Sequence, residues 1–276
     1  MINYLKSFIS RKAPHYISIC CIIKDENNYL DEWVNYHLKV GVQHFYIYDN
    51  GSTIPVQDTL QKLDLLKYVT VINFPGVSMQ YVTYKHCLKK YGMQSRWIAF
   101  IDTDEFIVPK TTHGDLRAFL KDYEGYGGLG INWLMFGSAG YVEKTGRPQL
   151  ESFVLRSDDT FDVNKHIKSI IQPKYTRKVF DAHSFKYIKW KFCVNEHFVR
   201  IPKSFSPVST DKIQLNHYFC RSLAEYHEKI KRGRSDDASI TRSVELFHEF
   251  DRASNKVEDT TILTFRDHPV YTPPYK

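Results

Sequence analysis

Two carboxylates separated by one residue are the part of this sequence best suited to chemistry. Asp102-Thr103-Asp104 follows the run 96–101, which ends in five uncharged, mostly bulky residues and therefore indicates a buried strand. Carboxylates beside a core are costly unless their charge is compensated. A divalent cation that also binds a diphosphate would compensate them, because Mg²⁺ and Mn²⁺ prefer oxygen ligands. A solvated turn is the alternative interpretation, since chance D-x-D pairs are common on protein surfaces.

The surrounding residues predict the elements that position this pair. Strand-like and helix-like segments alternate in the order strand 15–23, helix 27–40, strand 43–48, helix 56–66, strand 68–74, helix 79–91 and strand 97–101. In the first helix, one buried face is predicted by the helical spacing of Leu30, Trp33, Val34, His37 and Leu38. This order predicts an α/β fold, in which helices cover a mostly parallel sheet.

Polar residues stand where three of these strands end. Ligands of such sheets bind beyond the carboxyl ends of the strands. The clusters at those ends are Lys24-Asp25-Glu26, Asp49-Asn50-Gly51-Ser52 and Asp102-Thr103-Asp104. We expect them to converge at one edge of the sheet, with Asp25 and Asp49 placed to bind a base or a ribose.

The second half of the chain is less regular. A strand is predicted from the glycine-rich turn at 127–130 to residue 136, with further strands around Phe153 and at 167–171, 187–194 and 213–219. Ser222 and Glu225 form a capping-box pattern, which begins a helix that ends near Gly233. A last helix is predicted at about 240–250.

The composition is that of a globular protein. The chain has 276 residues, of which 42% are hydrophobic, and no apolar run approaches the ~20 residues of a membrane span. Five cysteines without regular spacing predict neither a disulfide framework nor a zinc site, and Cys20-Cys21 is expected in the core. The first residues lack the pattern of a signal peptide. We therefore expect a reducing compartment and a cytoplasmic protein.

The net charge of +7 suits phosphorylated ligands, anionic lipids or nucleic acid. The basic residues are dispersed and no nucleic-acid-binding motif is present, so we expect no nucleic-acid partner. Residues 4–12 form a short basic amphipathic segment with two interpretations. It contacts an anionic membrane surface, such as the inner face of a membrane, or it is a frayed terminus.

A resemblance to a known family covers about residues 17–237. Residues 21–33 are similar to the opening of glycosyltransferases of family 92 (DUF23) and of a related family 2-like group. His37 and Gly41 match the His-x-x-x-Gly of that family, and residues 102–106 resemble its D-x-D-E-F metal motif. The other matching positions are Asp49-Asn50-x-Ser52, Trp133 with Phe136-Gly137-Ser138, Lys168-Ser169-Ile170-Ile171, Asn216-His217-Tyr218 and Lys231-Arg232-Gly233-Arg234.

The resemblance implies a GT-A fold, which is Rossmann-like, with a mixed, mostly parallel sheet and an irregular C-terminal elaboration. We expect a basic segment at 1–14 and one domain at 15–276, with a nucleotide-binding half at about 15–110 and an acceptor half at about 111–276. The implied activity is metal-dependent, inverting transfer of a sugar from a nucleotide-sugar, such as UDP-galactose or another UDP-hexose. The implied acceptor is a glycan or a glycolipid in surface polysaccharide synthesis.

The resemblance also implies roles for particular residues. Asp102, Asp104 and the late His217 are the expected ligands of Mn²⁺ or Mg²⁺, while a structural histidine is the alternative for His217. Contacts to the nucleotide-sugar are expected from Lys24, Asp25, Glu26, Asp49, Asn50, Ser52, Asp102 and Lys168, with Arg232 and Arg234 as further partners of the diphosphate.

Inversion requires a base that takes the proton of the acceptor hydroxyl. The candidates are carboxylates that follow the D-x-D, namely Glu143, Glu151, Asp158, Asp159, Asp181 and Glu196. We predict Asp104, on the donor side, together with Glu151 and Asp181 as the catalytic residues. His183 and His197 are candidates for contacts to the acceptor or to phosphate.

Two other classes of function compete with this interpretation. A Mg²⁺-dependent sugar nucleotidyltransferase also uses paired carboxylates, but it is expected to have a glycine-rich phosphate loop after the first strand, and residues 24–28 contain no glycine. A non-catalytic module would bind glycans or anionic lipids through its basic surface. The intact acidic strand ends argue against that module.

Overall fold

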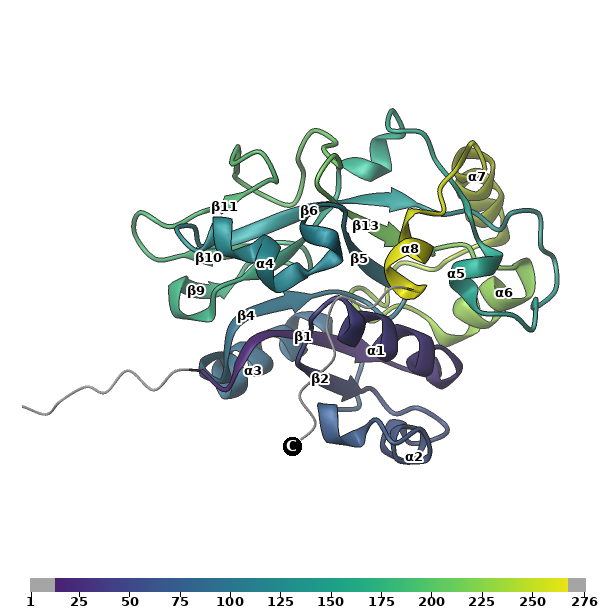
Figure 1. The fold of residues 1–276 in the computed structure, drawn as a ribbon. Helices are drawn as coiled ribbons and strands as arrows, with labels where there is room; N and C mark the ends of the chain where they lie inside the picture. The colour runs from purple at the N-terminus through teal and green to yellow at the C-terminus, as the bar shows by residue number, and fades with distance from the viewer. Residues whose placement is uncertain (1–12, 268–276) are drawn as a thin grey trace, which may run out of the picture.

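A computed structural model describes residues 13–267 and shows a mixed α/β fold (Figure 1). Ten strands form one sheet in the order β12-β11-β6-β8-β4-β1-β2-β3, with β13 beside β6 and β5 beside β13. The first half of the chain supplies four strands with parallel pairing: β1 (His15–Ile23), β2 (His44–Asp49), β3 (Val69–Asn73) and β4 (Ser95–Phe100). The predicted α/β fold with a mixed, mostly parallel sheet is confirmed.

The second half of the chain extends the same sheet. Its strands are β5 (Glu105–Pro109), β6 (Gly128–Met135), β8 (Ile167–Ile171), β11 (Cys193–Val194), β12 (Arg200–Ile201) and β13 (Ile213–His217). Because β8 is antiparallel to both β4 and β6, β6 runs in the direction of β4. β13 lies parallel to β6 and antiparallel to β5, with His217 opposite Glu105. The carboxyl ends of β1, β4, β6 and β13 therefore lie at the same edge.

Helices cover both faces of the sheet. α1 (Leu30–Lys39) packs on one face through the side chains that its spacing predicts: Leu30, Trp33, Val34, His37 and Leu38. α3 (Gln80–Tyr91) covers the other face, where its Tyr84 and Cys87 pack with Cys20 and Ile22 of β1. The residues of β1 alternate between the two cores, which explains why the whole strand is apolar.

The remaining helices are mostly short. They are α2 (Val56–Lys62), α4 (Leu116–Leu120), α5 (Gln149–Ser152), α6 (Leu223–Arg232), α7 (Val244–Ser254) and α8 (Thr261–Asp267). α6 begins with the predicted capping box, in which Ser222 and Glu225 each bind the backbone N–H of the other. The predicted last helix begins at Val244 instead of residue 240, and α4, α8 and β5 were not predicted.

Two predicted strands in the second half are wrong. Phe153 follows the helix α5, and only the short β7 (Leu155–Arg156), paired with β14 (Val257–Glu258), comes after it. The carboxylate of Glu32 on α1 accepts hydrogen bonds from the backbone N–H groups of Gln149 (2.9 Å) and Leu150 (3.3 Å), which a helix start leaves without partners. The strand predicted at 187–194 is two strands separated by a turn: β10 (Phe185–Tyr187), which pairs with β9 (Thr176–Val179), and β11.

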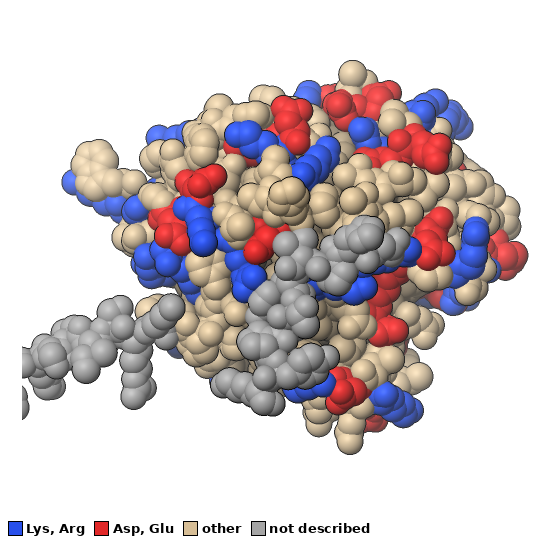
Figure 2. Space-filling view, in the orientation of Figure 1, with Lys and Arg blue, Asp and Glu red and all other residues tan. Residues whose placement is uncertain are grey.

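All five cysteines are free and buried, and Cys20 and Cys21 lie in the core as predicted. The face seen in Figure 2 carries Lys and Arg side chains interspersed with Asp and Glu, which agrees with the dispersed charge of the sequence. Within residues 13–267, no helix has the length and apolar character needed to cross a membrane. The basic segment predicted at 4–12 lies outside the described residues.

Candidate active site

A cavity of about 660 Å³ lies at the edge of the sheet where the parallel strands end. This volume is within the usual range of small-molecule sites. The three polar clusters converge there as expected, since Glu26, Asn50, Asp102 and Asp104 all line the cavity. Further lining residues come from β6, β8, β13 and α6, and they include Trp133, Lys168, His217 and Lys229.

Asp104 is held between two groups that favour its ionised form. The Lys229 ammonium on α6 donates to its Oδ2 at 2.6 Å, and His217 Nε2 lies 3.6 Å from its Oδ1. Burial opposes the charge of Asp104, but Lys229 and His217 outweigh it and hold the pKa well below the usual range. The backbone carbonyl of Asp104 accepts from Tyr218 N (2.8 Å), which joins the acidic turn to the end of β13.

Asp102 is bound from two other elements. Lys168 on β8 donates to Oδ2 at 2.7 Å, and Gln80 on α3 donates to Oδ1 at 2.8 Å. Lys168 is only 2% exposed, and although burial opposes its charge, Asp102 and Glu105 raise its pKa well above the usual range. The predicted diphosphate contact Lys168 is therefore a buried cation at the cavity wall.

Glu105 is a buried residue that lies directly behind the acidic pair. It accepts hydrogen bonds from Trp133 Nε1 (2.7 Å) and from the backbone N–H of Asp102 (2.8 Å). Burial raises the pKa of Glu105 to about 8, and the attraction of Lys168 does not offset it. Glu105 thereby fixes both the Trp133 ring and the turn that carries Asp102.

Glu26 completes the set of paired carboxylates. It accepts from the Thr103 hydroxyl, pairs with Arg232 of α6, and lies 3.6 Å from Arg221. Burial opposes its charge, but the two guanidinium groups outweigh it and lower the pKa of Glu26. Lys229 and Arg232 are three residues apart on α6, so both address the cavity from one side of that helix.

The lining of the cavity carries more positive than negative groups. Six Lys or Arg side chains face four carboxylates: Lys24, Lys168, Lys229, Arg232, Arg234 and Arg242 against Glu26, Asp102, Asp104 and Asp236. Three of these carboxylates, Glu26, Asp102 and Asp104, already have a cation partner on another element. The excess of cations suits a ligand that brings its own negative charge.

Of the three predicted metal ligands, Asp104 and His217 lie together, with His217 Nε2 3.6 Å from Asp104 Oδ1. Asp102 lines the same cavity, but among residues 13–267 it does not form a group with them in which all ligand atoms lie within 4.8 Å of one another. Burial lowers the pKa of His217 despite the opposing Asp104, so its imidazole is neutral, and Asp104 is ionised. These are the protonation states in which both groups bind metals. Lys168 and Gln80 each use one oxygen of Asp102, and carboxylate oxygens have a second lone pair. Asp104 and His217 therefore have the chemistry of ligands to Mn²⁺ or Mg²⁺, and a third ligand from Asp102 stays a prediction.

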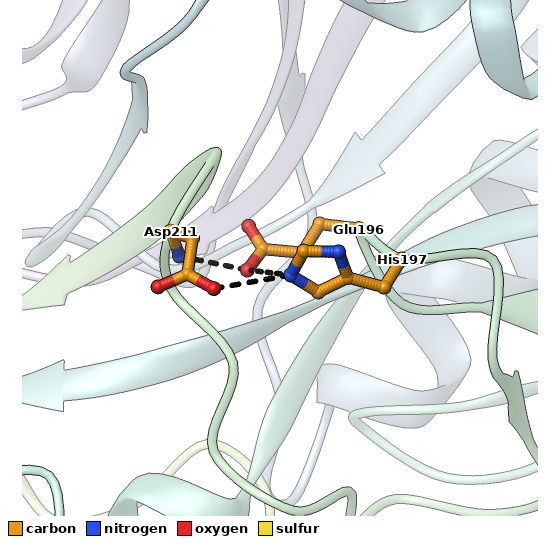
Figure 3. A group of neighbouring side chains, drawn as sticks. All are labelled: Glu196, His197 and Asp211. Carbon is orange, nitrogen blue, oxygen red and sulfur yellow. Dashed lines mark hydrogen bonds and ion pairs between the residues drawn. The ribbon is translucent and has the colours of Figure 1, made fainter.

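A second acidic group, Glu196, His197 and Asp211, lies away from the cavity (Figure 3). Glu196 is buried and accepts four hydrogen bonds, from Ser209 Oγ and the backbone N–H groups of Asp211, Lys212 and Ile213, at 2.7–2.8 Å. Four donors use all the lone pairs of a carboxylate. Glu196 therefore orders the loop that leads into β13.

Several predicted nucleotide contacts bind one another instead of lining the cavity. Asp25 accepts from Thr53 N at 2.6 Å and donates its own N–H to Ser52 Oγ at 3.0 Å. Asp49 accepts from Ser52 N and from the first residue of α2, Val56 (2.8 and 3.1 Å). These bonds join the loops after β1 and β2, while their neighbours Lys24 and Asn50 reach the cavity. A nucleotide contact by Asp25, Asp49 or Ser52 stays a prediction.

None of the six carboxylates proposed as the base is among the lining residues: Glu143, Glu151, Asp158, Asp159, Asp181 and Glu196. Glu151 pairs with Arg266 at 2.6 Å, and Asp181 accepts hydrogen bonds from the turn that contains His183. His183 lines the cavity and His197 does not. The roles of Glu151 and Asp181 stay predictions.

Sequence reasoning missed Lys229, Gln80 and Arg221, the partners of the acidic residues. One signal was present for Lys229, because it stands three residues before Arg232 in a helix that the capping box had located. Gln80 and Arg221 had no comparable signal, since their roles depend on how distant segments pack.

Comparisons with known proteins agree on one family. The model of glycosyltransferase family 92 matches residues 14–252. A family 92 protein of Ricinus communis is 25% identical over 219 residues, 75% of this chain and 36% of that protein. One from Oryza sativa is 33% identical over 98 residues, 35% of this chain and 17% of that protein. The chain spans about a third of the length of the Ricinus relative.

Solved structures show a weaker likeness. HddC from Yersinia pseudotuberculosis has a TM-score of 0.43 at 9% identity, covering 77% of this chain and 97% of that one. Glucosyl-3-phosphoglycerate synthase from Mycobacterium tuberculosis, in complex with Mn²⁺, uridine diphosphate and its product, has a TM-score of 0.33 at 13% identity. That match covers 59% of this chain and 58% of the synthase.

Proposed function

Because this chain belongs to glycosyltransferase family 92, we propose that it transfers a sugar from a nucleotide-sugar to a hydroxyl group with inversion of the anomeric carbon. The observation that carries the proposal is the cavity at the strand ends, in which Glu26, Asp102 and Asp104 are each paired with a cation. The excess of lining cations over carboxylates supports an anionic ligand such as a nucleoside diphosphate.

The cations of α6 and β8 have a direct role in this proposal. Lys229, Arg232 and Lys168 bind the diphosphate and stabilise the charge that it gains as the sugar leaves. Because these side chains are held by Asp104, Glu26 and Asp102, they are oriented before the substrate arrives. Such preorganised electrostatic groups commonly contribute about 10²–10³ in rate each.

The metal site belongs to the same proposal. Asp102, Asp104 and His217 would hold Mn²⁺ or Mg²⁺, and the cation would act as a Lewis acid on the diphosphate. The support is the chemistry of Asp104 and His217, one ionised carboxylate and one neutral imidazole 3.6 Å apart, with Asp102 in the lining of the same cavity.

The finer identity of the substrates is proposed on the family resemblance. The donor is a UDP-hexose such as UDP-galactose, and the acceptor is a glycan or a lipid-linked glycan of a surface polysaccharide. For a lipid-linked acceptor, the basic residues at 4–12 would contact anionic lipid at the inner face of a membrane, which places the protein in the cytoplasm. Deleting residues 1–12 should then weaken binding to phosphatidylglycerol vesicles, and unchanged binding would refute the contact.

A thermal-shift screen of the full chain tests the function. UDP-, GDP- and CMP-sugars are added with Mn²⁺ or with EDTA, and we expect a UDP-hexose with Mn²⁺ to raise Tm by several degrees while EDTA removes the effect. At a ligand concentration of 100 Kd the stabilisation is about 2.7 kcal/mol.

Other outcomes of the screen point to the competing classes of function. Stabilisation by a nucleoside triphosphate with a sugar phosphate, but by no nucleotide-sugar, would indicate a nucleotidyltransferase. Stabilisation only by anionic glycans or lipids would indicate a binding module.

A further inference from the structure

Two histidines outside the predicted metal ligands line the cavity. His166 immediately precedes β8, and His183 lies in the turn between β9 and β10. Both line the cavity, with ring centroids 5.5 Å apart. Both also contact the ring of Trp133, at centroid distances of 4.9 Å for His166 and 5.3 Å for His183. The three rings therefore form one aromatic wall.

Hydrogen bonds to the backbone fix the tautomer of both rings. His183 Nδ1 lies 2.9 Å from the carbonyl oxygen of Ile167, and His166 Nδ1 lies 3.0 Å from that of Val163. A carbonyl oxygen only accepts, so each Nδ1 carries the hydrogen. In a neutral ring the lone pair is then on Nε2, and among residues 13–267 neither Nε2 has a hydrogen-bond partner.

Both rings are neutral at physiological pH. Burial, with the nearby Lys168 ammonium, lowers the pKa of His183 to about 4, and burial also lowers the pKa of His166. Their Nε2 atoms are therefore hydrogen-bond acceptors without charge. Such atoms suit a hydroxyl donor and give no attraction to a phosphate or a carboxylate.

His37 shows what a histidine with a purely structural role looks like in this fold. It is fully buried in α1, its Nδ1 donates to the carbonyl of Trp33 (2.8 Å), and its Nε2 accepts from Ile107 N (3.3 Å). Both nitrogens of His37 are used, whereas His183 and His166 line the cavity and, in the described part of the chain, each uses only its Nδ1.

Asp181 holds the His183 turn in place. Its Oδ1 accepts from the backbone N–H groups of His183 (2.8 Å) and Ser184 (2.7 Å), and its Oδ2 accepts from Ser204 Oγ (2.5 Å). Burial opposes its charge, but these hydrogen bonds outweigh it and lower the pKa of Asp181. Asp181 is therefore a positioning residue for His183.

We propose that the imidazoles of His166 and His183 form the acceptor subsite, which takes a sugar hydroxyl, and that His183 Nε2 is the base for the transfer. This inference rests on the proposed function. The acceptor oxygen forms its bond to the anomeric carbon as its proton moves to His183 Nε2. The bond from that carbon to the phosphate oxygen breaks, and its electron pair leaves with the nucleoside diphosphate.

His183, rather than His166, receives the proton because it lies nearer the donor end. His183 is hydrogen-bonded to both neighbours of Lys168 on β8, because its Nδ1 donates to the Ile167 carbonyl (2.9 Å) and its own carbonyl accepts from Ser169 Oγ (2.6 Å). Lys168 in turn binds Asp102, whereas the ring of His166 is hydrogen-bonded to Val163. A bound diphosphate adds negative charge in the same cavity, which makes the imidazole a stronger base while the substrate is present. His166 then holds a second hydroxyl of the acceptor sugar.

The test uses the full chain with UDP-galactose and Mn²⁺, and follows UDP release with water and with a panel of free saccharides as acceptors. For His183→Ala we expect kcat to fall about 10²–10⁴-fold, the range of general-base catalysis, with the affinity for UDP and Mn²⁺ unchanged. Added imidazole should restore part of the rate, a response that a structural defect would not give. His166→Ala should mainly raise the acceptor KM, and His197→Ala, outside the cavity, should match the wild type.

Three results would overturn the inference. Full turnover by His183→Ala would exclude its role as base. A loss of turnover accompanied by weaker UDP binding, a lower Tm and no response to imidazole would show that His183 is structural. If the wild-type chain bound no UDP-hexose and released no UDP in any condition, both the proposed function and this inference would fail.

Discussion

The two ends of the cavity differ in how their buried polar groups are stabilised. At the charged end, Asp104 is paired with Lys229 and Asp102 with Lys168, so each anion has a cation within hydrogen-bond distance. At the imidazole end, His166 and His183 carry no charge, and within residues 13–267 each keeps one nitrogen without a hydrogen-bond partner.

This difference assigns each end to a different kind of ligand. Separating a buried ion pair is costly because it leaves a charge without a partner. A charged ligand that arrives with a metal ion removes this cost, because the metal ion pairs with the carboxylates and the ligand pairs with the cations. Uncharged imidazole nitrogens that accept hydrogen bonds do not attract an anion, but they bind a hydroxyl group without the cost of burying a charge. The cavity can therefore keep a diphosphate at one end and a sugar hydroxyl at the other.

The largest expected effect concerns Asp104. Asp104→Asn keeps the shape of the side chain but removes the charge that holds Lys229 and would bind the metal. We expect the affinity for UDP with Mn²⁺, and the turnover, to fall by about 10³-fold. Calorimetric titration with UDP measures the first and UDP release measures the second.

The double variant Asp104→Asn with Lys229→Met separates ligand binding from fold stability. It removes both charges of the pair, so we expect its stability to exceed that of Asp104→Asn alone while UDP binding stays lost. Recovery of UDP binding in the double variant would contradict the metal role of Asp104.

A smaller effect is expected from Lys168→Met, which tests whether the charged end needs its cations for stability. The substitution leaves Asp102 without its ion-pair partner beside the buried Glu105, and we expect a loss of about 3 kcal/mol in the free energy of unfolding. Urea unfolding measures it. Lys24→Met, an exposed residue of the same cavity, is the matched control and should change stability by less than about 0.5 kcal/mol.

The buried His37 makes the stability of the fold depend on pH. Burial lowers the pKa of His37 from 6.5 to about 3, so below pH 6.5 the unfolded chain binds a proton that the folded chain does not. Stability from this residue is complete above pH 6.5 and falls by about 1.4 kcal/mol per pH unit on acidification, or about 2 kcal/mol at pH 5. The free energies of unfolding of the wild type and of His37→Gln, each at pH 6.5 and at pH 5, measure this loss. An equal change of stability with pH in the two proteins would refute the assignment to His37.

The smallest effect concerns the cap of α6. Ser222→Ala removes the capping box and should cost about 1 kcal/mol of stability. Because α6 carries Lys229 and Arg232, we also expect weaker UDP binding, by a few-fold. Asp115→Ala removes the cap of α4, whose residues are not among those that line the cavity, and should cost a similar amount without changing UDP affinity. Equal UDP affinities in the two variants would show that the cap of α6 has no part in the site.

The regular half of the fold was accessible from the sequence because its signals are local. The spacing of Leu30, Trp33 and His37 set the face of α1, and uninterrupted apolar runs marked strands buried on both faces. Because parallel strands end at the same edge of the sheet, their predicted order also predicted that the polar clusters containing Glu26, Asn50 and Asp102 lie together.

What failed depended on contacts between distant segments. The helix α5 exists where a strand was predicted because Glu32, from another helix, binds its first N–H groups. Lys229 reaches Asp104 across 125 positions of the chain, and no local pattern encodes that contact. A carboxylate was sought as the base, while His183, like His166, lines the cavity with a lone pair on Nε2.

The antiparallel ladder between β5 and β13 determines how this protein can vary in evolution. His217 lies opposite Glu105 in the ladder, and Tyr218 N binds the carbonyl of Asp104, so the separation of the predicted metal ligands is set by strand register. Segments inserted in the long connections between the strands that follow β5 leave that register unchanged. Such insertions can reshape the surroundings of His166 and His183 and so diversify the acceptors, while the donor end is inherited intact. A single residue inserted within β13, in contrast, would turn His217 to the other face of the sheet.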